Sequence, residues 1–493
     1  MQLHTPLEAA SWLRERVTGS LYADSRRVQA GDGFMAWPGA AADARQYVHE
    51  VLNVGATACL VDVDGVEEYG FSSEKIAVYA GLKSAAAPIA VAYFQEPSKH
   101  LQTIAITGTN GKTSTAWWLA HAMGKLNRRC AMVGTLGIGA PEAMVFNGLT
   151  TPDPVLLQQQ LRRFVDEGFA ACAIEASSIG IAEGRLDGTQ FQVAVFTNFT
   201  QDHLDYHGSM QNYWAVKESL FAWHGLTSAV INTDDSGGRA LNEKLKSSDL
   251  DVWTFSINQA ARLQARTIEQ NGSVLNFVVA EGADQRKVST YAIGLYNVSN
   301  LLGVVGAMRA LGVSLEDAAK SCCFLPSVPG RLNTLSRAGT PLVVIDYAHT
   351  PDAIEKVLAA LRPVADDRGG QLWCVFGCGG DRDATKRPLM AAKAQKYSDH
   401  IVVTSDNPRS ESPSGIISQI LLGLTQHESV HVQSDRALAI VQAITDAKPE
   451  DVVLLAGKGH ETCQEIGGIK YPFEDQTHAL AALNERRVMG AGS

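Results

Sequence analysis

Short apolar runs alternate with longer amphipathic stretches through most of the chain. Apolar runs rich in β-branched residues predict buried strands at 103–107, 130–135, 172–177, 193–198 and 229–233. Between them, apolar residues recur with a helical period, and we expect helices at about 112–125 and 155–165. Strands that alternate with helices in this way are typical of a doubly wound parallel sheet.

A second series of the same kind follows a proline-containing segment. It predicts a helix at 353–361 and strands at 343–346, 372–377, 401–404 and 452–456. Segment 325–330 is the expected linker, because Pro326 and Pro329 resist both helix and central strand. We therefore expect an α/β protein with three domains: a smaller mixed α/β domain at 1–99, a central parallel-sheet domain at 100–328 and a Rossmann-like α/β domain at 329–493.

The composition supports a large folded protein and excludes several classes of partner. The chain has 493 residues, of which 45% are hydrophobic, and its net charge is −10. Disorder as the dominant state is excluded, because disordered chains have few hydrophobic residues. An acidic chain without a basic run repels nucleic acid and anionic membranes. We also expect no membrane span and no secretory signal, because no apolar stretch is long enough and the N-terminus lacks a basic region.

The cysteines fit a reducing compartment. They form no CxxC pair, and several fall in predicted strands: Cys59, Cys130, Cys172, Cys322, Cys323, Cys374, Cys378 and Cys463. We interpret them as reduced core residues of a cytoplasmic protein rather than disulfides or zinc ligands.

The strongest local signal lies between the predicted strand at 103–107 and the predicted helix at 112–125. The loop reads Gly108, Thr109, Asn110, Gly111, Lys112 and Thr113. Glycines let backbone N–H groups surround phosphate oxygens, and the helix N-terminus adds positive potential. Lys112 can reach the β- and γ-phosphates of a nucleotide, and the Thr113 hydroxyl can bind Mg²⁺. The spacing departs from the general Walker A motif, which would need glycine in place of Ile106. The alternative is a glycine-rich turn with an incidental lysine.

Several further motifs stand in register with this loop. They are EASS at 175–178, TNFTQDHLDYHG at 197–208, YNVSN at 296–300, PGR at 329–331, DYAHTP at 346–351, DNPR at 406–409 and GKGHE at 457–461. Together with the loop, they resemble the Mur ligase superfamily, which includes folylpolyglutamate synthetase, over essentially the whole chain. The resemblance implies a P-loop ATPase-like central domain, a UDP-substrate-binding N-terminal domain and an amino-acid-binding C-terminal domain.

The resemblance also implies an activity. It is ATP-dependent amide formation that adds meso-2,6-diaminopimelate to UDP-N-acetylmuramoyl-L-alanyl-D-glutamate through an acyl phosphate, in the synthesis of the peptidoglycan precursor. The expected partners are therefore these small molecules, with no nucleic acid, and we expect a monomer. Two alternatives remain open: folylpolyglutamate synthetase or another Mur ligase, and a nucleotide-regulated binding protein that has lost catalysis.

Four catalytic residues follow from the resemblance: Lys112, Glu175, His203 and Lys217. Lys112 steadies the transferring phosphoryl group, and Thr113 and Glu175 bind Mg²⁺. His203 binds a second Mg²⁺. Lys217 matches the lysine that CO₂ carbamylates in this family (N6-carboxylysine), and the carbamate is also a Mg²⁺ ligand. The alternatives are a salt bridge for Glu175, an exposed loop position for His203 and a solvated helix position for Lys217.

The nucleotide site also draws on residues outside the phosphate loop. The resemblance places Asn297 and Asn300 against the nucleotide, although both could instead cap a helix N-terminus. Arg331 and Asp346 are the expected contribution of the C-terminal domain, a cation for phosphate and a carboxylate for the ribose. His349 lies near them, with a structural hydrogen bond as the alternative. The site is then complete only when the domains close.

Contacts to the UDP substrate follow in the same way. The matched positions are Ser25, Thr150, Thr151, Ser177, Glu183 and Arg185. Four positions depart from the family pattern. Glu183 replaces a common glutamine, Ile179 replaces a common histidine, and Ala40 and Ala41 stand where His-Gln often precedes alanine, so few side-chain contacts are expected from them.

The DNPR motif carries the expected specificity for the amino acid. Its position after the predicted strand at 401–404 places it at the carboxyl end of a parallel strand. Arg409 offers a planar fork suited to a carboxylate, Pro408 fixes the loop, and Asp406 and Asn407 can accept from an ammonium group. Arg382, Gly457 and Glu461 match the rest of the pocket. The alternative is an Asx-Pro turn with a surface arginine.

Overall fold

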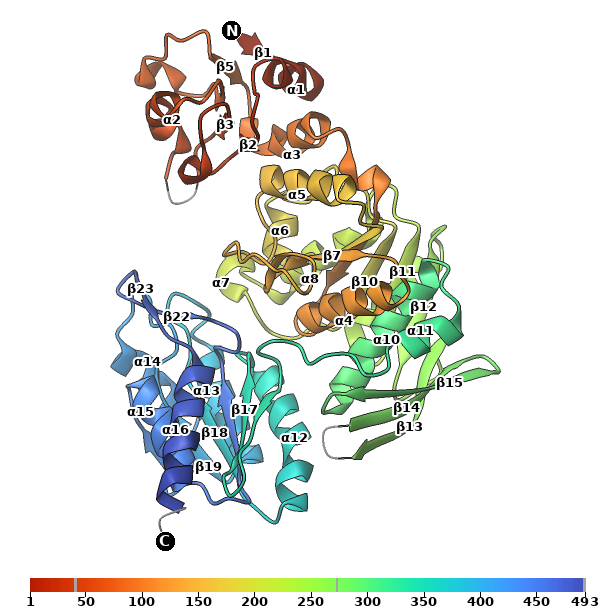
Figure 1. The fold of residues 1–493 in the computed structure, drawn as a ribbon, viewed down its shortest axis with the longest axis vertical. Helices are drawn as coiled ribbons and strands as arrows, with labels where there is room; N and C mark the ends of the chain where they lie inside the picture. Colours follow the sequence, from red (N-terminus) through yellow and green to blue (C-terminus); the bar gives the residue numbers. More distant parts are fainter. Residues whose placement is uncertain (40–41, 272–273, 491–493) are drawn as a thin grey trace.

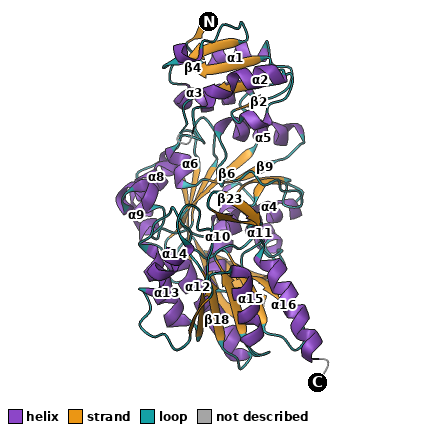
Figure 2. Ribbon diagram, turned by 90° about the vertical axis from the view of Figure 1, so that its left-hand side faces the viewer, coloured by secondary structure: helices purple, strands orange, loops and turns teal. Residues whose placement is uncertain are grey.

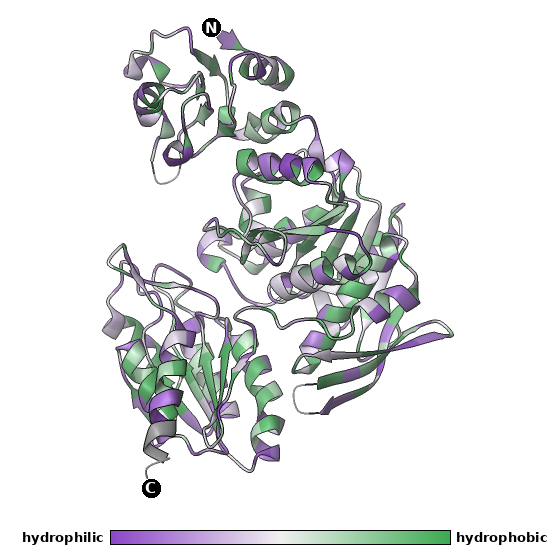
Figure 3. Cartoon of the chain, viewed as in Figure 1, coloured by the Kyte–Doolittle hydropathy of each residue, from purple (hydrophilic) through white to green (hydrophobic). Residues whose placement is uncertain are grey.

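Three sheets, each covered by helices, follow one another along the long axis of the molecule (Figures 1 and 2). The computed structural model describes residues 1–39, 42–271 and 274–490. The central strands of each sheet are hydrophobic along their length (Figure 3), because helices bury both of their faces. These layers confirm the predicted α/β fold class. Within the described ranges, no helix is long and apolar enough to cross a membrane.

The first sheet is formed by parallel strands in the order β1-β5-β4-β3-β2. Its elements are β1 (Gln2–Leu3), α1 (Pro6–Arg14), β2 (Leu21–Tyr22), β3 (Gly33–Ala36), α2 (Val48–Val54), β4 (Ala58–Asp62), β5 (Ile76–Tyr79) and α3 (Leu82–Tyr93). Ala40 and Ala41, for which we expected few contacts, lie outside the described residues.

The second sheet has the strand order β15-β14-β13-β12-β11-β10-β6-β9-β7-β8. Its strands are β6 (Gln102–Thr107), β7 (Cys130–Gly134), β8 (Gly137–Gly139), β9 (Ala171–Glu175), β10 (Val193–Phe196), β11 (Ser228–Asn232), β12 (Asp251–Ser256), β13 (Leu263–Asn271), β14 (Val274–Glu281) and β15 (Asp284–Tyr291). The predicted strands 103–107, 130–135, 172–177, 193–198 and 229–233 all form, and they lie parallel at the centre of the sheet.

The edge of this sheet differs from the expected parallel arrangement. Strand β14 runs antiparallel to both β13 and β15. Antiparallel neighbours need only a short turn between them, whereas parallel neighbours need a crossover. The turn between β14 and β15 contains Gly282 with φ +59°. Along β14, deeply buried residues alternate with less buried ones, as expected where only one face of the sheet is covered.

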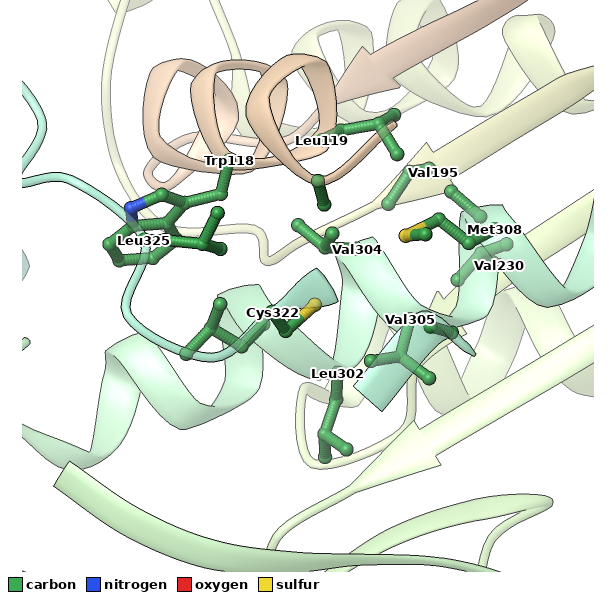
Figure 4. Packing of buried hydrophobic residues seen from close by; sticks show 14 of the residues in the cluster. Trp118, Leu119, Val195, Val230, Leu302, Val304, Val305, Met308, Cys322 and Leu325 are labelled. Atoms are coloured by element: carbon green, nitrogen blue, oxygen red, sulfur yellow. The ribbon is translucent and has the colours of Figure 1, made fainter. Parts of the chain in front are cut away.

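Helices cover both faces of the second sheet. They are α4 (Lys112–Lys125), α5 (Pro154–Asp166), α6 (Ser178–Ala182), α7 (Leu204–His207), α8 (Met210–Ser219), α9 (Ser236–Leu245), α10 (Leu295–Ala310) and α11 (Leu315–Ser321). Helix α10 is buried almost all round, with Leu302, Val304 and Met308 among its core residues (Figure 4). Trp118 of α4 packs in the same core and donates its indole N–H to the Pro326 carbonyl at 3.0 Å. This core holds the phosphate-loop helix firmly in place.

The third sheet has the order β16-β17-β21-β18-β19-β20. Its elements are β16 (Asn333–Leu335), β17 (Leu342–Asp346), α12 (Pro351–Asp367), β18 (Leu372–Phe376), α13 (Lys386–Tyr397), β19 (His400–Val403), α14 (Pro413–Leu421), β20 (Val430–Val432), α15 (Arg436–Asp446), β21 (Val452–Ala456), the hairpin β22 (Cys463–Ile466) and β23 (Ile469–Pro472), and α16 (Asp475–Gly490). Of the six strands in this sheet, β16 is antiparallel to its neighbour and the others run parallel. The loops after β17, β18, β19 and β21 therefore emerge at one edge.

A buried ion pair joins two helices beneath that edge. Arg436 and Asp475 have fully buried side chains, and the guanidinium donates to the two carboxylate oxygens at 2.7 Å each. The same guanidinium donates to the carbonyls of Ser405 and Ala456, at 3.3 and 3.0 Å. The pair therefore ties the ends of β19 and β21 together from below.

All eight cysteines are free thiols, and six of them are buried. Burial raises the pKa of the Cys59, Cys130 and Cys374 thiols to about 12. The six buried cysteines are core residues, as predicted, whereas Cys323 and Cys463 are partly exposed.

Candidate active site

The predicted phosphate loop lies between β6 and α4, and its backbone requires glycine. Gly108 and Gly111 have φ values of +142° and +87°. A Cβ atom at Gly111 would lie 2.4 Å from the side-chain oxygen of Asn300, and one at Gly108 would lie 1.9 Å from the Thr197 hydroxyl. The loop is therefore packed directly against the ends of β10 and α10, which leaves no room for a side chain.

Lys112 curls back over this loop. Its amine donates to the carbonyls of Gly108 and Thr109 at 2.9 and 2.8 Å. The surrounding protein removes water from the half-buried amine and lowers the pKa of Lys112, while the nearby Glu175 carboxylate opposes that shift. The amine is thus held at the mouth of the loop, where a phosphate oxygen could replace the two carbonyls.

Lys217 lies in the interior and reaches the same loop. Its side chain is 1% exposed, and its amine donates to the Gly108 carbonyl at 2.8 Å, which is also an acceptor for Lys112. The amine lies 4.6 Å from the centroid of the Tyr213 ring. Burial, and then the charge of Lys112, lower the pKa of Lys217 well below its ordinary value. The solvated helix position considered from the sequence is therefore wrong.

Glu175 ends strand β9 with a fully buried carboxylate. It accepts hydrogen bonds from the Thr113 hydroxyl at 2.9 Å, the Thr135 amide at 2.9 Å and the Thr135 hydroxyl at 3.1 Å. A Cβ atom at Gly134 would lie 2.1 Å from this carboxylate, so the neighbouring strand β7 needs glycine there. Among the described residues, Glu175 forms no ion pair, and the salt-bridge alternative is not observed.

His203 and Asp202 stand where the central and C-terminal sheets meet. His203 has φ +54° and lies just before α7, with its Nε2 atom 3.5 Å from the Asp202 carboxylate. Burial lowers the pKa of His203 to about 4, even though Asp202 opposes the shift. From the C-terminal side, His349 Nε2 and Lys386 Nζ approach Asp202 at 3.7 and 3.5 Å. Burial alone would raise the pKa of Asp202, but these neighbours outweigh it and hold the pKa well below its usual range.

A cavity of 460 Å³ lies between the central and C-terminal sheets, next to the phosphate loop. Its walls include Asn297, Asn300, Arg331 and Asp346, which come from both sides. The Asp346 carboxylate accepts from the amides of Leu332 and Ala348, at 2.8 Å each, and its burial raises its pKa. The structure thus brings the predicted nucleotide residues together around one hollow.

The capping alternative for the two asparagines is not observed. Helix α10 begins after Gly294, which is its N-cap, and no side chain caps it. Asn297 instead donates to the Ile293 carbonyl at 2.9 Å and accepts from Asn300 at 3.1 Å. The Arg331 guanidinium reaches the Thr113 hydroxyl at 3.3 Å and lies over the Tyr347 ring. Asn110 also donates to Asp352 at 2.9 Å, so polar contacts cross the cavity mouth.

The residues predicted to contact the muramyl peptide form a connected group beside Glu175. The Thr151 hydroxyl donates to the Glu175 carbonyl at 2.7 Å and pairs with the Ser177 hydroxyl at 2.9 Å. Arg185 donates to the Thr151 carbonyl at 2.9 Å, and the Thr150 hydroxyl lies 3.0 Å from that of Thr135. Glu183 is engaged by Tyr206 at 2.7 Å and by Lys83 at 3.0 Å. Ser25 begins a short 3-10 helix in the N-terminal sheet, and its contact to the substrate stays a prediction.

The predicted amino-acid residues gather on three loops of the third sheet. Asp406 and Asn407 follow β19, and a Cβ atom at Gly457 would lie 2.4 Å from the Asp406 carboxylate. Arg409 has φ +52° and donates to the Gly380 carbonyl at 2.6 Å, so the loop after β18 packs against Pro408 and Arg409. Asn407 donates to Glu461 at 2.8 Å. Arg382 is exposed and donates to the Asp381 carbonyl. A plain turn with a surface arginine does not describe this packing.

The donor atoms at the phosphate loop suit a magnesium ion. They are the Thr113 hydroxyl and the Glu175 carboxylate, both hard oxygen ligands. In the part of the chain that the structure describes, no group of three or more His, Cys, Asp or Glu side chains could hold a metal by itself. The Thr113–Glu175 pair by itself fits Mg²⁺ in nucleotide sites, which is bound through one or two protein groups together with substrate phosphates and water.

Several residues of the site were not singled out from the sequence. Thr135 binds Glu175, Asp202 and Lys386 form the junction described above, and Lys458 contacts both Asn407 and Glu461. Asp202 and Lys458 lie inside two of the motifs quoted above, so the motif residues beside them could have pointed to them. No local pattern points to Thr135 or Lys386, because only the fold brings them to the site.

Comparison with known proteins agrees with this geometry. The model of the Mur ligase middle domain matches residues 106–308, and that of the Mur ligase glutamate ligase domain matches residues 330–459. A protein of Acidovorax sp. (strain JS42), named UDP-N-acetylmuramoyl-L-alanyl-D-glutamate–2,6-diaminopimelate ligase, is 56% identical over 98% of both chains. A protein of the same name from Janthinobacterium sp. (strain Marseille) is 47% identical over 96% of this chain and 95% of its own. A solved structure of a ligase with that name has a TM-score of 0.63 and 31% identity over 95% of both chains.

Proposed function

The chain belongs to the Mur ligase family, and from this premise we propose that it is the ATP-dependent ligase that joins meso-2,6-diaminopimelate to UDP-N-acetylmuramoyl-L-alanyl-D-glutamate during peptidoglycan synthesis. The observation that carries the proposal is the convergence of Lys112, Thr113, Glu175 and Lys217 on one loop, beside a cavity with walls from two sheets. A binding protein without catalysis would have no need for this convergence. We further propose that the enzyme is a cytoplasmic monomer.

Each of the three sheets has its own binding function in this proposal. We assign UDP binding to residues 1–99, ATP binding to residues 100–328 and amino-acid binding to residues 329–493. The N-terminal sheet argues against folylpolyglutamate synthetase, which has no uridine nucleotide to bind. The loop of Asp406, Asn407 and Arg409 argues against the other Mur ligases. It offers the Asp406 carboxylate as well as the Arg409 guanidinium at the carboxyl end of β19.

The reaction runs in two steps. The γ-carboxylate of the D-glutamyl residue attacks the γ-phosphorus of ATP, which gives an acyl phosphate and ADP. The amine of diaminopimelate then attacks the acyl carbon, and the tetrahedral intermediate collapses to the amide with loss of phosphate and a proton. Lys112 and Arg331 stabilise the charge on the transferring group, since both reach the phosphate loop. Asn300 and Asp346 hold the nucleotide.

Magnesium would be held by Thr113 and Glu175 at one site and by His203 and carbamylated Lys217 at another. When bound, it would neutralise phosphate charge during transfer. The contribution of the chain is to hold these donors rigidly. Thr135 fixes both oxygens of Glu175, and the half-buried His203 is kept neutral at physiological pH by its low pKa. A neutral imidazole is the form able to bind a metal.

Phosphate release tests the proposal. We expect phosphate from ATP only when UDP-N-acetylmuramoyl-L-alanyl-D-glutamate and meso-diaminopimelate are both present, with one new amide per phosphate in the mass spectrum of the product. Omission of either substrate is the control. Phosphate release that ignores the UDP substrate would overturn the assignment, and binding of ATP without any turnover would favour the non-enzymatic alternative.

We further propose that CO₂ carbamylates Lys217. The reaction needs a neutral amine, and the nitrogen attacks CO₂ with loss of one proton to give an anionic carbamate. Two observations favour it. The amine is buried beside the cation of Lys112, which disfavours a second positive charge, and it lies at the phosphate loop, where an anionic oxygen ligand could hold Mg²⁺.

Substitution and labelling test this modification. We expect Lys217→Ala to lose activity, with partial recovery in a short-chain carboxylic acid that occupies the vacated position. Lys217→Arg should stay inactive because a guanidinium remains cationic. The exposed Lys244 of α9, which pairs with Glu218, the residue after Lys217 in α8, is the matched control and should tolerate alanine. A ¹³C-carbamate signal from labelled bicarbonate should appear in the wild type and vanish in Lys217→Ala. Its absence from the active wild-type enzyme would refute the modification.

A further inference from the structure

Lys458 is a fully buried lysine within the amino-acid site. It lies in the turn after β21, between Gly457 and Gly459, and its side chain has no exposed surface. Its ammonium has three protons, and three acceptors surround it. They are the Glu461 carboxylate at 2.8 Å, the Cys463 carbonyl at 2.7 Å and the Asn407 side-chain oxygen at 3.1 Å. A lysine ammonium has three donors and no acceptor, so none is left for a ligand.

These contacts fix the orientation of the Asn407 amide. Its oxygen accepts from Lys458 and from the Glu465 amide at 3.0 Å, and its nitrogen donates to Glu461 at 2.8 Å. Because the oxygen faces two donors, the amide cannot turn over without losing both bonds. Among the described residues, the second N–H of the Asn407 amide meets no acceptor, so it can donate to a ligand.

The same contacts leave one oxygen of Glu461 for a ligand. Its Oε2 atom accepts from both Lys458 and Asn407. Its Oε1 atom has the Tyr347 hydroxyl at 3.5 Å, the limit of a hydrogen bond. The carboxylate is thus anchored through one oxygen and presents the other.

We propose that Lys458 is a positioning residue for the incoming amino acid, which holds Asn407 and Glu461 so that the second Glu461 oxygen, Oε1, binds the ammonium group of diaminopimelate. This inference rests on the proposed function. Lys458 joins three segments at once: the end of β19, the turn after β21 and the start of the β22–β23 hairpin. In that hairpin, the Glu465 carbonyl accepts a hydrogen bond from the Arg409 backbone amide at 3.0 Å. Loss of Lys458 would therefore disturb the recognition of both ends of the amino acid.

The test is a double-mutant cycle of Lys458→Met with Glu461→Gln, followed by phosphate release at varied diaminopimelate and varied ATP. We expect Lys458→Met to lower kcat/KM for diaminopimelate about 100-fold, as a small misplacement of binding groups can. KM for ATP should stay unchanged. In the exposed control Lys448→Met, both kcat/KM for diaminopimelate and KM for ATP should equal those of the wild type. In the Glu461→Gln background, Lys458→Met should cost no more than about threefold further, because contacting residues are not additive.

Other results would overturn the inference. Additive single effects, or equal losses for ATP and diaminopimelate, would show that Lys458 serves general stability alone. If Lys458→Met does not fold, by its thermal melting curve, Lys458→Gln takes its place in the cycle, since an amide can keep part of the hydrogen bonding. The wild type separates this inference from the proposed function. Turnover of diaminopimelate by the wild type with an unchanged Lys458 variant refutes only the role of Lys458, whereas no turnover by the wild type refutes the proposed function and this inference with it.

Discussion

We expect Lys112→Ala to slow amide formation by about 10³-fold or more while the affinity for the UDP substrate stays close to that of the wild type. The Lys112 amine is held at 2.9 and 2.8 Å from the carbonyls of Gly108 and Thr109, in the loop whose residues Asn110, Gly111 and Thr113 line the cavity. Its charge therefore acts where the phosphoryl group is transferred. In the proposed function, the UDP substrate binds to the N-terminal sheet and the Thr151–Ser177 group, neither of which includes Lys112.

Two measurements check this expectation. Phosphate release reports the chemical step, and calorimetric titration with UDP-N-acetylmuramoyl-L-alanyl-D-glutamate reports binding. Lys125 ends the same helix and is exposed, so Lys125→Ala is the matched control and should retain activity. Turnover of Lys112→Ala near the wild-type rate would show that this loop is not the ATP site.

The second large effect concerns the choice of amino acid. We expect meso-diaminopimelate to be preferred to L-lysine by about 10⁴-fold in kcat/KM, since L-lysine lacks the distal carboxylate that would bind the remaining N–H groups of the Arg409 guanidinium. Arg409 is held in place for that role. Its backbone has φ +52°, its guanidinium donates to the Gly380 carbonyl at 2.6 Å, and Glu465 lies 3.8 Å away.

Competition between the two amino acids measures this preference directly. Arg409→Met should lose most of the discrimination through a lower kcat/KM for diaminopimelate, while ATP use at saturating amino acid remains. The exposed Arg337 of the same sheet supplies the control variant Arg337→Met. Comparable kcat/KM values for the two amino acids in the wild type would reject diaminopimelate and leave the general ligase chemistry intact.

Local patterns predicted much of the fold. The helix expected at about 112–125 spans Lys112–Lys125, because Gly111 with φ +87° marks its start and its side chains pack into the core. The antiparallel edge β13–β15 was not predicted, because the direction in which neighbouring strands pair depends on the turns between them rather than on periodicity.

The site was predicted where its residues share a motif and missed where the fold alone brings them together. Lys112 and Thr113 could be placed from the loop sequence. The burial of Lys217 could not, because polar and apolar residues are mixed along α8 and the contact of Lys217 with Gly108 spans 109 positions of the chain. Likewise, nothing local marks Lys386 as a partner of Asp202, since their contact depends on how two sheets meet.

The Arg436–Asp475 pair limits how this chain can drift in evolution. Replacing either partner alone would leave an uncompensated buried charge, at a cost of about 3–5 kcal/mol. Domains are commonly stable by only about 5–15 kcal/mol, so most such intermediates would fall close to unfolding. Exchanging both residues together for apolar ones of similar volume can be nearly neutral. The protein with both charges and the protein with neither are therefore comparable in stability, whereas the proteins with one charge are much less stable. Descendants of this sequence should keep both charges or neither.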